Sequence, residues 1–359
     1  MKKIEVFDCT LRDGGYVNDW KFSNEQVREC YKYCSNTNVD YMEIGFRNFK
    51  KKDFLEKFGE TFFCTEEYIN NVIGDINGCK LAVMVTINAF DMSEFVPKEQ
   101  SKIDLVRVLM AYHGFKNKSD EELDIKTLED GVVQINKLLE LGYEVSFNIG
   151  RIDKLTKNQL YTVCKMMSQT KIKYFYMADT YGSTDLDSIE KLIPYINFLF
   201  KDVFENKDIK IGFHAHDNCS NATAKALHSL KFGVDIIDGC ALGYGRGSGN
   251  AKLELIMMDL NNNYGTNYYL IEVISYGDKY LINYKDCLNN LCYNVVYAIC
   301  SYLGCHVTYG IEIVENYPQM DIKDIYNVLF KIKSLNKHMF FYEKLFMEIY
   351  NENKISLYV

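Results

Sequence analysis

The sequence contains few of the features that cross-link a chain or anchor it in a membrane. Only 3 of its 359 residues are proline, and its 12 cysteines include no C-x-x-C pair. Because these cysteines are scattered over a long chain, we expect reduced, mostly buried thiols and no disulfide scaffold. No apolar run approaches the ~18 residues of a membrane span, and the first residues lack the apolar segment of a signal peptide. We therefore expect a cytoplasmic protein with no membrane association.

The net charge of the chain limits the kinds of molecule that it is expected to bind. The formal net charge is −8 and the isoelectric point is near 5.4. This balance argues against a general surface for nucleic acids or anionic membranes, although a local basic pocket is compatible with it. Hydrophobic residues make up 48% and charged residues 25%, as in ordinary globular proteins. We therefore expect a small-molecule ligand and no nucleic acid.

Short apolar runs alternate with longer helical patterns over the first 250 residues. Eight strand-and-helix units in about 260 residues are the number and size typical of an α/β protein with a (β/α)8 TIM barrel. A doubly wound sheet is the rival, but "RDGGY" follows the first strand instead of the G-x-G-x-x-G turn. Helices are expected over 127–142 and 220–233, among others. The expected strands are 3–10, 40–46, 80–87, 103–111, 143–149, 172–178, 209–216 and 234–242.

The pattern changes near residue 270, after which only helical segments follow. We expect a TIM-barrel catalytic domain over residues 1–268 and a helical C-terminal region over residues 269–359. The aromatic residues of that region suggest that it packs on the barrel or on another subunit. We expect a homo-oligomer, with a partner enzyme as a further option.

Two clusters of polar residues follow expected strands. In "GFHAHDN", His214 and His216 alternate with Ala215, so both imidazoles point to the same side of strand seven. In "DCTLRDGGY", Asp13 can supply a carboxylate ligand, and the planar guanidinium of Arg12 can hold an oxyanion. Gly14 and Gly15 suggest a tight loop at this point. Active sites of TIM barrels lie at the C-terminal ends of the strands, so we expect both clusters at one mouth.

A third cluster, "ALGYGRGSGNAKLE" over residues 241–254, follows strand eight. Its glycines permit unusual backbone angles, and its position matches the phosphate-binding loops of many barrels. Each cluster also has an ordinary interpretation: satisfied interior histidines, a surface Arg–Asp pair and a plain flexible loop. Those interpretations weaken because all three clusters come to one mouth.

Together, "DCTLRDGG", "GFHAHDN" and "LGYGRGSGNAKLE" resemble the DRE-TIM metallolyase superfamily, over about residues 4–254. That group includes 4-hydroxy-2-oxovalerate aldolase, HMG-CoA lyase and isopropylmalate synthase. The resemblance implies that Asp13, His214 and His216 bind a divalent metal and that Arg12 is catalytic. Mn²⁺ is our first expectation for the metal, with Mg²⁺, Co²⁺ and Zn²⁺ as alternatives.

The resemblance also implies supporting positions for substrate binding or for the surroundings of the metal. Asn250 matches an amide that in some members binds the metal or lies beside it. Glu43 matches an acid at the end of strand two, and Asp179 and Thr180 match positions at the end of strand six. A barrel-core carboxylate and a turn aspartate are the ordinary interpretations of Glu43 and Asp179.

The sequence departs from the family pattern in two places. Tyr16 stands where the aldolase branch has a histidine base. We expect a metal and Arg12 to lower the pKa of its phenol, so that Tyr16 takes the proton of the substrate's 4-hydroxyl group or holds that hydroxyl while another group does so. His113 and His306 are the alternative bases. The acyl-CoA lyases have a cysteine in the loop after strand eight, but none lies between Leu242 and Asn250.

The resemblance implies an enzyme, a metal-dependent carbon–carbon lyase. We expect an aldolase that cleaves or forms a bond of a 4-hydroxy-2-oxo acid through a pyruvate enolate, with a 2-oxo acid and an aldehyde as its small-molecule partners. Three alternatives stay open. They are an acyl-CoA lyase or synthase of the same superfamily, a non-catalytic barrel subunit, and a non-haem iron oxygenase, whose facial triad also has two histidines and one carboxylate.

Overall fold

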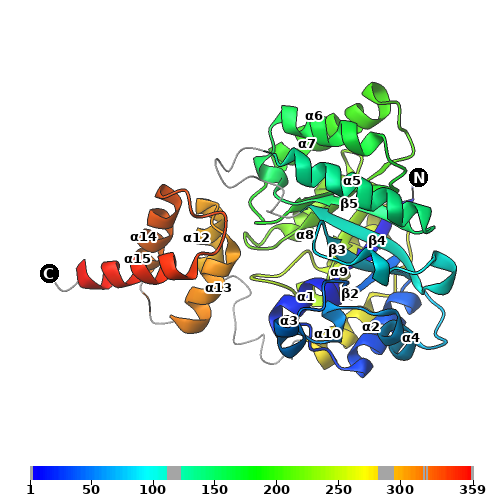
Figure 1. Cartoon of the computed structure of the whole chain (residues 1–359), viewed down its shortest axis with the longest axis horizontal. Coiled ribbons are helices and arrows are strands. Elements are labelled where there is room, and N and C mark those ends of the chain that lie inside the picture. The colour runs from blue at the N-terminus through cyan, green and yellow to red at the C-terminus, as the bar shows by residue number, and fades with distance from the viewer. Residues whose placement is uncertain (1–2, 111–122, 282–294, 318–319, 321, 357–359) are drawn as a thin grey trace.

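The computed structural model describes residues 3–110, 123–281, 295–317, 320 and 322–356, and its centre is a closed barrel of eight parallel strands (Figure 1). Each strand pairs with the next, and β1 closes the barrel against β8. The predicted (β/α)8 barrel is therefore confirmed. The strands are β1 Glu5–Asp8, β2 Tyr41–Phe46, β3 Lys80–Thr86, β4 Ile103–Met110, β5 Glu144–Ile149, β6 Tyr174–Asp179, β7 Lys210–Ala215 and β8 Ile236–Gly239.

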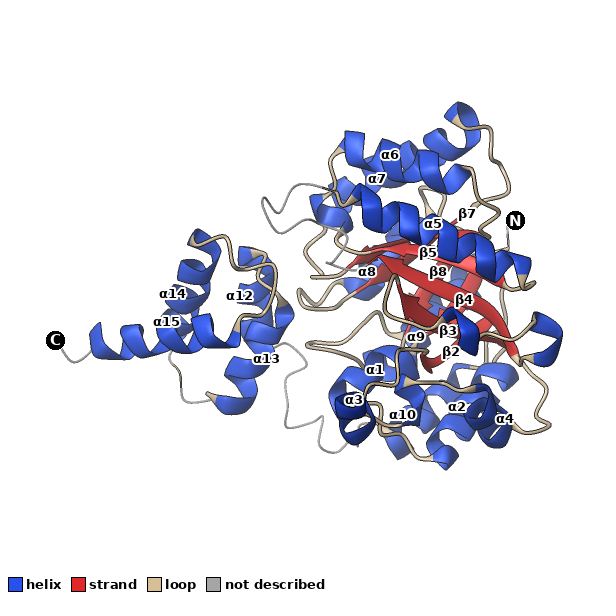
Figure 2. Cartoon of the chain, in the orientation of Figure 1, coloured by secondary structure: helices blue, strands red, loops and turns tan. Residues whose placement is uncertain are grey.

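The strands are buried on both faces, which explains their nearly continuous apolar sequences. All six residues of β2 are buried, as are all four of β8. Helices cover the outer face of the barrel, as Figure 2 shows. Charged residues also lie within these apolar strands. Glu43, Arg107 and Asp238 are fully or almost fully buried and belong to the site described below.

Local signals in the sequence begin several of the helices. Ser23 and Gln26 form a capping box at the start of α2, and Thr156 and Gln159 form another at the start of α6. The helices around the barrel are α1 Thr10–Asn18, α2 Asn24–Asn36, α3 Lys52–Lys57, α4 Glu66–Ile73, α5 Ile125–Glu140, α6 Lys157–Ser168, α7 Leu186–Phe198, α8 Ala222–Leu230, α9 Leu253–Tyr264 and α10 Leu270–Tyr280. The helices expected over 127–142 and 220–233 correspond to α5 and α8.

One local expectation is wrong. Gly14 and Gly15 do not form a loop, because they lie inside helix α1. Their role is close packing: a Cβ atom on Gly14 would lie 2.5 Å from the Tyr244 ring, and one on Gly15 would lie 2.1 Å from the Trp20 ring. The two glycines therefore let aromatic side chains pack directly against the backbone beside Arg12 and Asp13.

The C-terminal helices form a group of their own beside the barrel (Figure 1). They are α12 Val295–Leu303, α13 Val307–Asn316, α14 Ile322–Ser334 and α15 Glu343–Ser356. Their apolar residues make a separate core that includes Leu329 and Phe346. Helix α10 instead packs on the barrel side, where the Tyr276 hydroxyl donates to the Gln26 carbonyl at 3.1 Å. We keep the division into residues 1–268 and 269–359 as a proposal.

Two contacts join the helical region to loops at the barrel mouth. The Tyr181 hydroxyl donates to the Met339 carbonyl at 3.4 Å, and Cys219 lies 3.1 Å from the Ser301 hydroxyl. The described part of the chain holds ten cysteines, each a free thiol. Among the described helices, none has the length and apolar character that crossing a membrane requires.

Candidate metal centre and active-site cavity

The structure brings the three predicted metal ligands together at the mouth of the barrel. Asp13 lies on α1, directly after β1, while His214 is on β7 and His216 just follows it. One ligand atom from each lies within 4.8 Å of the others. Oδ2 of Asp13 is 3.3 Å from Nε2 of His214 and 3.8 Å from Nε2 of His216. Side chains from the ends of β1 and β7 therefore meet at one place.

The atoms that face this point lack hydrogen-bond partners although they are buried. Both oxygens of Asp13, Nε2 of His214 and both polar side-chain atoms of Asn250 are in this state. A Cβ atom on Gly245 would lie 2.0 Å from Nδ2 of Asn250 and 3.6 Å from Cγ of Asp13, so only glycine leaves room for the amide there. Buried polar atoms without partners are costly. Two imidazole nitrogens, a carboxylate and an amide oxygen therefore fit a divalent cation.

The protonation states of Asp13 and His216 suit metal binding. Burial alone would raise the pKa of Asp13, but Arg12 and the two imidazoles outweigh it and hold that pKa well below its usual range. Burial lowers the pKa of His216 well below its usual value, helped by the charges of Arg246 and Arg12. His216 is therefore a neutral imidazole, and Asp13 is ionised. Both are in the state that binds metal.

His214 is oriented by a second carboxylate on its far side. Its Nδ1 atom lies 3.0 Å from Oδ2 of Asp238, and Cys9 lies 3.9 Å from the same nitrogen. Burial would lower the pKa of His214, but the carboxylates of Asp13 and Asp238 beside its two ring nitrogens raise it well above its usual value. The imidazole thus needs either a proton or a metal on Nε2. A histidine ligand whose other nitrogen donates to a carboxylate is the usual arrangement at metal centres.

Arg12 is held in place by buried carboxylates. Its Nε atom donates to Oε2 of Glu43 at 2.7 Å, and its Nη1 atom lies 3.2 Å from Oδ2 of Asp13. Glu43 is not at the end of β2, as the resemblance implied, but in the middle of the strand, fully buried. Its position makes it the support of Arg12.

Sequence reasoning missed the residue that connects the two halves of the site. Arg107 on β4 donates to Glu43 at 3.1 Å and to Asp238 at 2.7 Å, so one guanidinium joins the support of Arg12 to the support of His214. Its Cζ atom lies 4.2 Å from the ring centres of both Phe7 and Tyr176. A charged residue in the middle of each of two otherwise apolar runs, Arg107 in β4 and Asp238 in β8, was the signal that could have found this pair.

The two predicted residues at the end of β6 have different surroundings. Asp179 accepts from Lys225 and from the Thr184 hydroxyl, the latter at 2.9 Å, and it does not line the cavity at the metal centre. Thr180 does line that cavity, and its hydroxyl accepts the backbone N–H of Arg151 at 2.9 Å. Thr180 therefore lies at the site, whereas Asp179 contacts Thr184 in the following loop and Lys225 on α8.

Tyr16 lines the cavity, but its environment differs from our expectation. The Arg246 guanidinium lies 5.1 Å from the centre of its ring, and the Trp20 ring packs edge-on at 4.6 Å. Burial raises the pKa of the Tyr16 phenol, and the opposing effects of Arg246 and Arg12 do not reverse this. Arg12 thus opposes the effect of burial without reversing it, and the expected lowering by the metal and Arg12 together stays a prediction. Because 43% of Tyr16 is exposed, solvent limits the size of the shift.

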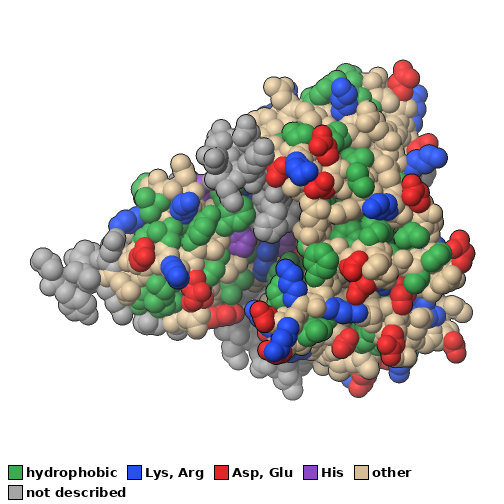
Figure 3. All heavy atoms as spheres, viewed as in Figure 1, with side chains coloured by type: hydrophobic (Ala, Val, Ile, Leu, Met, Phe, Trp, Pro, Cys, Tyr) green, Lys and Arg blue, Asp and Glu red, His purple; other side chains and the backbone are tan. Residues whose placement is uncertain are grey.

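The cavity in front of the metal ligands has a volume of about 730 Å³, which is the size of a small-molecule site. Aromatic rings that include Trp20, Phe46 and Phe58 line one side, and Arg151 and Arg246 also line it. The helical region adds His306, Thr308 and Ile311. Figure 3 shows histidine and Lys or Arg side chains in the hollow where that region meets the barrel.

His306 and His113 are the other two candidate bases. His306 caps α13 by accepting the Thr308 N–H on Nδ1 at 3.2 Å. Burial, followed by the charges of Arg246 and Arg151, lowers the pKa of His306 to about 3. His306 is therefore a neutral side chain of the cavity wall that carries its proton on Nε2. His113 lies outside the described residues.

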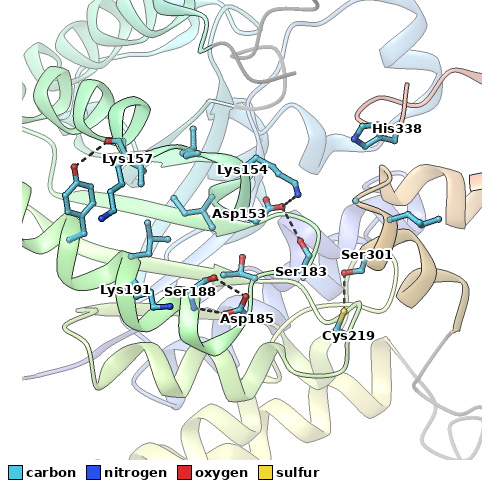
Figure 4. A pocket seen from close by; sticks show the side chains of 18 of the residues that line it. Asp153, Lys154, Lys157, Ser183, Asp185, Ser188, Lys191, Cys219, Ser301 and His338 are labelled. Atoms are coloured by element: carbon cyan, nitrogen blue, oxygen red, sulfur yellow. Dashed lines mark hydrogen bonds and ion pairs between the residues drawn. The ribbon is translucent and has the colours of Figure 1, made fainter. Parts of the chain in front are cut away.

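Two other groups of ligand-type side chains occur in the described part of the chain. Cys9, His214 and Asp238 overlap the metal centre, while Asp8, Cys30 and Cys34 lie elsewhere. In the second group, Asp8 already accepts from Tyr33 and from the Thr10 hydroxyl. A separate cavity of about 710 Å³ lies between the helical region and the segments that follow β5 and β6 (Figure 4). Figure 4 shows Asp153 there, paired with Ser183 and Lys154.

Comparison with known proteins gives one consistent result. The family model described as HMGL-like matches residues 3–275. The chain is 24% identical to a 4-hydroxy-2-oxovalerate aldolase of Carboxydothermus hydrogenoformans, over 93% of this chain and 94% of that protein. It is 23% identical to an oxaloacetate decarboxylase of Mycobacterium tuberculosis, over 71% of this chain and 69% of the other. The fold is similar to that of the N-terminal domain of a proposed aldolase from Bacteroides vulgatus, with a TM-score of 0.68 at 23% identity, over 88% of this chain and 98% of that one.

Proposed function

This chain belongs to the HMGL-like family, which is made of carbon–carbon lyases, and we propose that it is a divalent-metal-dependent aldolase acting on 4-hydroxy-2-oxo acids. The observation that carries the proposal is the convergence of Asp13, His214 and His216 beside Arg12, with the carboxylate oxygens of Asp13 and Nε2 of His214 buried without hydrogen-bond partners. Curated relatives named 4-hydroxy-2-oxovalerate aldolase support the same reaction class.

We infer that Asp13, His214 and His216 hold the cation, with Asn250 beside it. A divalent cation there would act as a Lewis acid toward the 2-oxo group of the substrate. Mn²⁺ is the first choice for this mixed nitrogen and oxygen set, and Mg²⁺, Co²⁺ and Zn²⁺ stay as alternatives. Asp238 and Glu43 support this arrangement by fixing His214 and Arg12.

Arg12 stabilises the negative charge that develops as the bond breaks. The proton leaves the 4-hydroxyl group, the C3–C4 bond breaks, and an aldehyde and a pyruvate enolate form. Glu43 holds the Nε atom of Arg12, the Nη1 atom lies beside Asp13, and the side chain lines the cavity. A fixed donor at a developing oxyanion is usually a large contribution to catalysis.

Tyr16 stays the proposed partner of the 4-hydroxyl group. Because burial raises its pKa in the metal-free protein, we propose that it holds the hydroxyl by a hydrogen bond, and that it acts as the base only when the site carries its cation. His306 donates from Nε2 in its neutral form and is less suited to remove a proton.

Two measurements test the proposal. The purified protein, freed of metal by a chelator and then given Mn²⁺, should cleave a 4-hydroxy-2-oxo acid and should exchange the methyl protons of pyruvate with solvent. His214→Ala and His216→Ala should lose Mn²⁺-dependent thermal stabilisation. His228→Ala is the matched control, because His228 pairs with Glu190 on α7, away from the cavity. Wild-type Mn²⁺ binding in both cavity variants would refute the site.

The alternative of an acyl-CoA lyase is tested in the same assay. The loop after β8 has no cysteine between Leu242 and Asn250, so we expect no cleavage of a 3-hydroxyacyl-CoA substrate. Cleavage of that thioester without cleavage of any 4-hydroxy-2-oxo acid would favour the acyl-CoA alternative. Absence of every lyase activity, with Mn²⁺ still bound, would favour the non-catalytic barrel.

A further inference from the structure

Arg151 is a buried arginine in the same cavity that forms no ion pair with any carboxylate of the described residues. It follows β5, it is 1% exposed, and it lines the cavity of the metal centre. Its Nε and Nη1 atoms are buried without hydrogen-bond partners. A buried cation is normally retained only with a counter-charge or a full set of hydrogen bonds. Arg151 is therefore arranged for an anionic partner that the described residues do not supply as an ion pair.

The guanidinium of Arg151 is fixed by its surroundings. Its backbone has φ 56° and ψ 46°, the left-handed region that costs a side-chain-bearing residue energy. The hydroxyl of Thr180 accepts its backbone N–H at 2.9 Å, and its Cζ atom lies 5.0 Å from the centre of the buried Tyr181 ring. The end of β6 thus holds both the main chain and the side chain of Arg151.

The nearest acid in the sequence, Asp153, forms no ion pair with Arg151. Burial raises the pKa of Asp153 and the nearby charge of Arg151 opposes this rise, but the direct partners of the carboxylate are other groups. Asp153 is paired with Lys154 at 3.6 Å and with the Ser183 hydroxyl at 3.3 Å, and it lines the separate cavity of Figure 4. The acids that line the metal-centre cavity within the described residues are Asp13 and Asp19. Both come from the segment after β1, and Asp13 is committed to the metal centre.

Other groups add positive charge near Arg151. Arg246 lines the cavity, and the charges of Arg246 and Arg151 both lower the pKa of His306, after burial. His306 is therefore close to both guanidinium groups and stays neutral. This part of the cavity attracts an anion, while the metal centre has its own carboxylate and imidazoles.

We propose that Arg151 binds a second anionic group of the substrate, on the half remote from the 2-oxo acid. This rests on the proposed function, in which the 2-oxo acid end lies at Asp13, His214 and His216. The substrate class is then a 4-hydroxy-2-oxo acid whose aldehyde half carries a carboxylate or a phosphate group. Both groups match the planar fork of a guanidinium, which can donate two parallel hydrogen bonds.

The test compares three substrates with the Mn²⁺-loaded full-length protein. They are 4-hydroxy-2-oxo acids whose distal end is a methyl group, a carboxylate or a phosphate ester. We expect kcat/KM for one anionic substrate to exceed that of the methyl substrate about 100-fold. Whichever anion is preferred identifies the class. Equal values for all three substrates in the wild-type protein would overturn the proposal without any variant.

Variants then assign the preference to Arg151. Arg151→Gln should lower kcat/KM for the anionic substrate about 100-fold and leave the methyl substrate within about threefold, while Arg151→Lys should lie between. Lys154→Gln is the matched control, since Lys154 is nearby but faces the other cavity. An equal fall for all three substrates in Arg151→Gln and Arg151→Lys would mean a structural role and would refute the proposal.

A separate readout distinguishes the two proposals. Exchange of the pyruvate methyl protons needs the metal centre and no distal group, so Arg151→Gln should retain it at the wild-type rate. Loss of exchange in the wild-type protein would refute the proposed function. Retained exchange with no preference for an anionic substrate would refute the role of Arg151 alone.

Discussion

The Oδ2 atom of Asp238 lies 3.0 Å from Nδ1 of His214, on the side of the imidazole opposite Asp13. The same oxygen accepts from Arg107 at 2.7 Å, and Arg107 also donates to Glu43, which holds Arg12. One continuous set of ion pairs inside the barrel therefore fixes a proposed metal ligand and the proposed catalytic arginine. The predictions below follow from this arrangement.

Replacing Asp238 by asparagine should weaken metal binding without removing a ligand. An asparagine oxygen can still accept from Nδ1 of His214, but it lacks the negative charge that makes the imidazole a better ligand. We expect the Kd for Mn²⁺ to rise about 10- to 100-fold in calorimetric titration. Glu190→Gln, which changes the carboxylate beside His228, is the control. An unchanged Kd in Asp238→Asn would mean that Asp238 serves only Arg107.

Arg12→Lys should lower kcat more than it changes KM. A lysine ammonium keeps the charge but cannot contact Glu43 through one nitrogen and the substrate through others. We expect kcat to fall about 100-fold, as when one donor to a developing oxyanion is removed. Steady-state kinetics measure both constants, with Arg28→Lys as the control because Arg28 donates to backbone carbonyls of α4. Wild-type kcat would remove Arg12 from the mechanism.

Asp8 should make folding stability depend on pH in an unusual direction. Burial raises the pKa of Asp8 from 3.8 to about 6, against the hydrogen bonds from Tyr33 and Thr10. The folded state therefore binds a proton that the unfolded state releases, so this contribution is complete below pH 3.8 and is lost as the pH rises through 6. The loss is about 3 kcal/mol of unfolding free energy.

Asp8→Asn tests this directly, because its side chain cannot ionise. Chemical denaturation at pH 4, 5, 6 and 7 should give a difference in unfolding free energy, variant minus wild type, that increases with pH across this window. Asp208→Asn, at an exposed loop position, should show no such trend. A constant difference for Asp8→Asn would mean that Asp8 keeps an ordinary pKa.

His306 should stay neutral through the physiological pH range. Burial, with Arg246 and Arg151 nearby, lowers the pKa of its imidazole to about 3. The Cε1–H resonance of His306, assigned by comparison with His306→Asn, should show no titration between pH 5 and pH 8. An inflection near pH 6.5 would contradict the burial of this side chain and would restore His306 as a candidate base.

Two truncated chains should separate the roles of α10 and the later helices. A chain ending at residue 281 keeps α10 and loses the cavity wall formed by His306 and Thr308, so we expect a folded barrel that binds Mn²⁺ with lower kcat/KM. A chain ending at residue 267 also uncovers the surface on which Val273 and Tyr276 are buried, so it should aggregate in size-exclusion chromatography. Full activity of the first chain would remove the helical region from the site.

Sequence patterns determined the barrel, the order of its strands and the proposed metal ligands. Apolar runs such as β7 are buried on both faces, so each strand is visible locally. The alternation of side chains in "HAH" places His214 and His216 on one side of the strand. The position of Asp13 after β1 then follows from the rule that strand ends meet at one mouth.

Only the tertiary structure decided which charged groups pair. Arg107, Glu43 and Asp238 are far apart in the chain, and barrel closure alone brings them into contact. The close packing of the Tyr244 and Trp20 rings against Gly14 and Gly15 in α1 is a contact that local propensity does not include. Docking of the helical region likewise brought His306 to the cavity, and barrel closure buried Arg151 with its Nε and Nη1 atoms lacking hydrogen-bond partners among the described residues. Such non-local contacts decide which ionisable groups are buried and which are paired. Burial and pairing in turn set the pKa values, and so the charges, of the groups in a site.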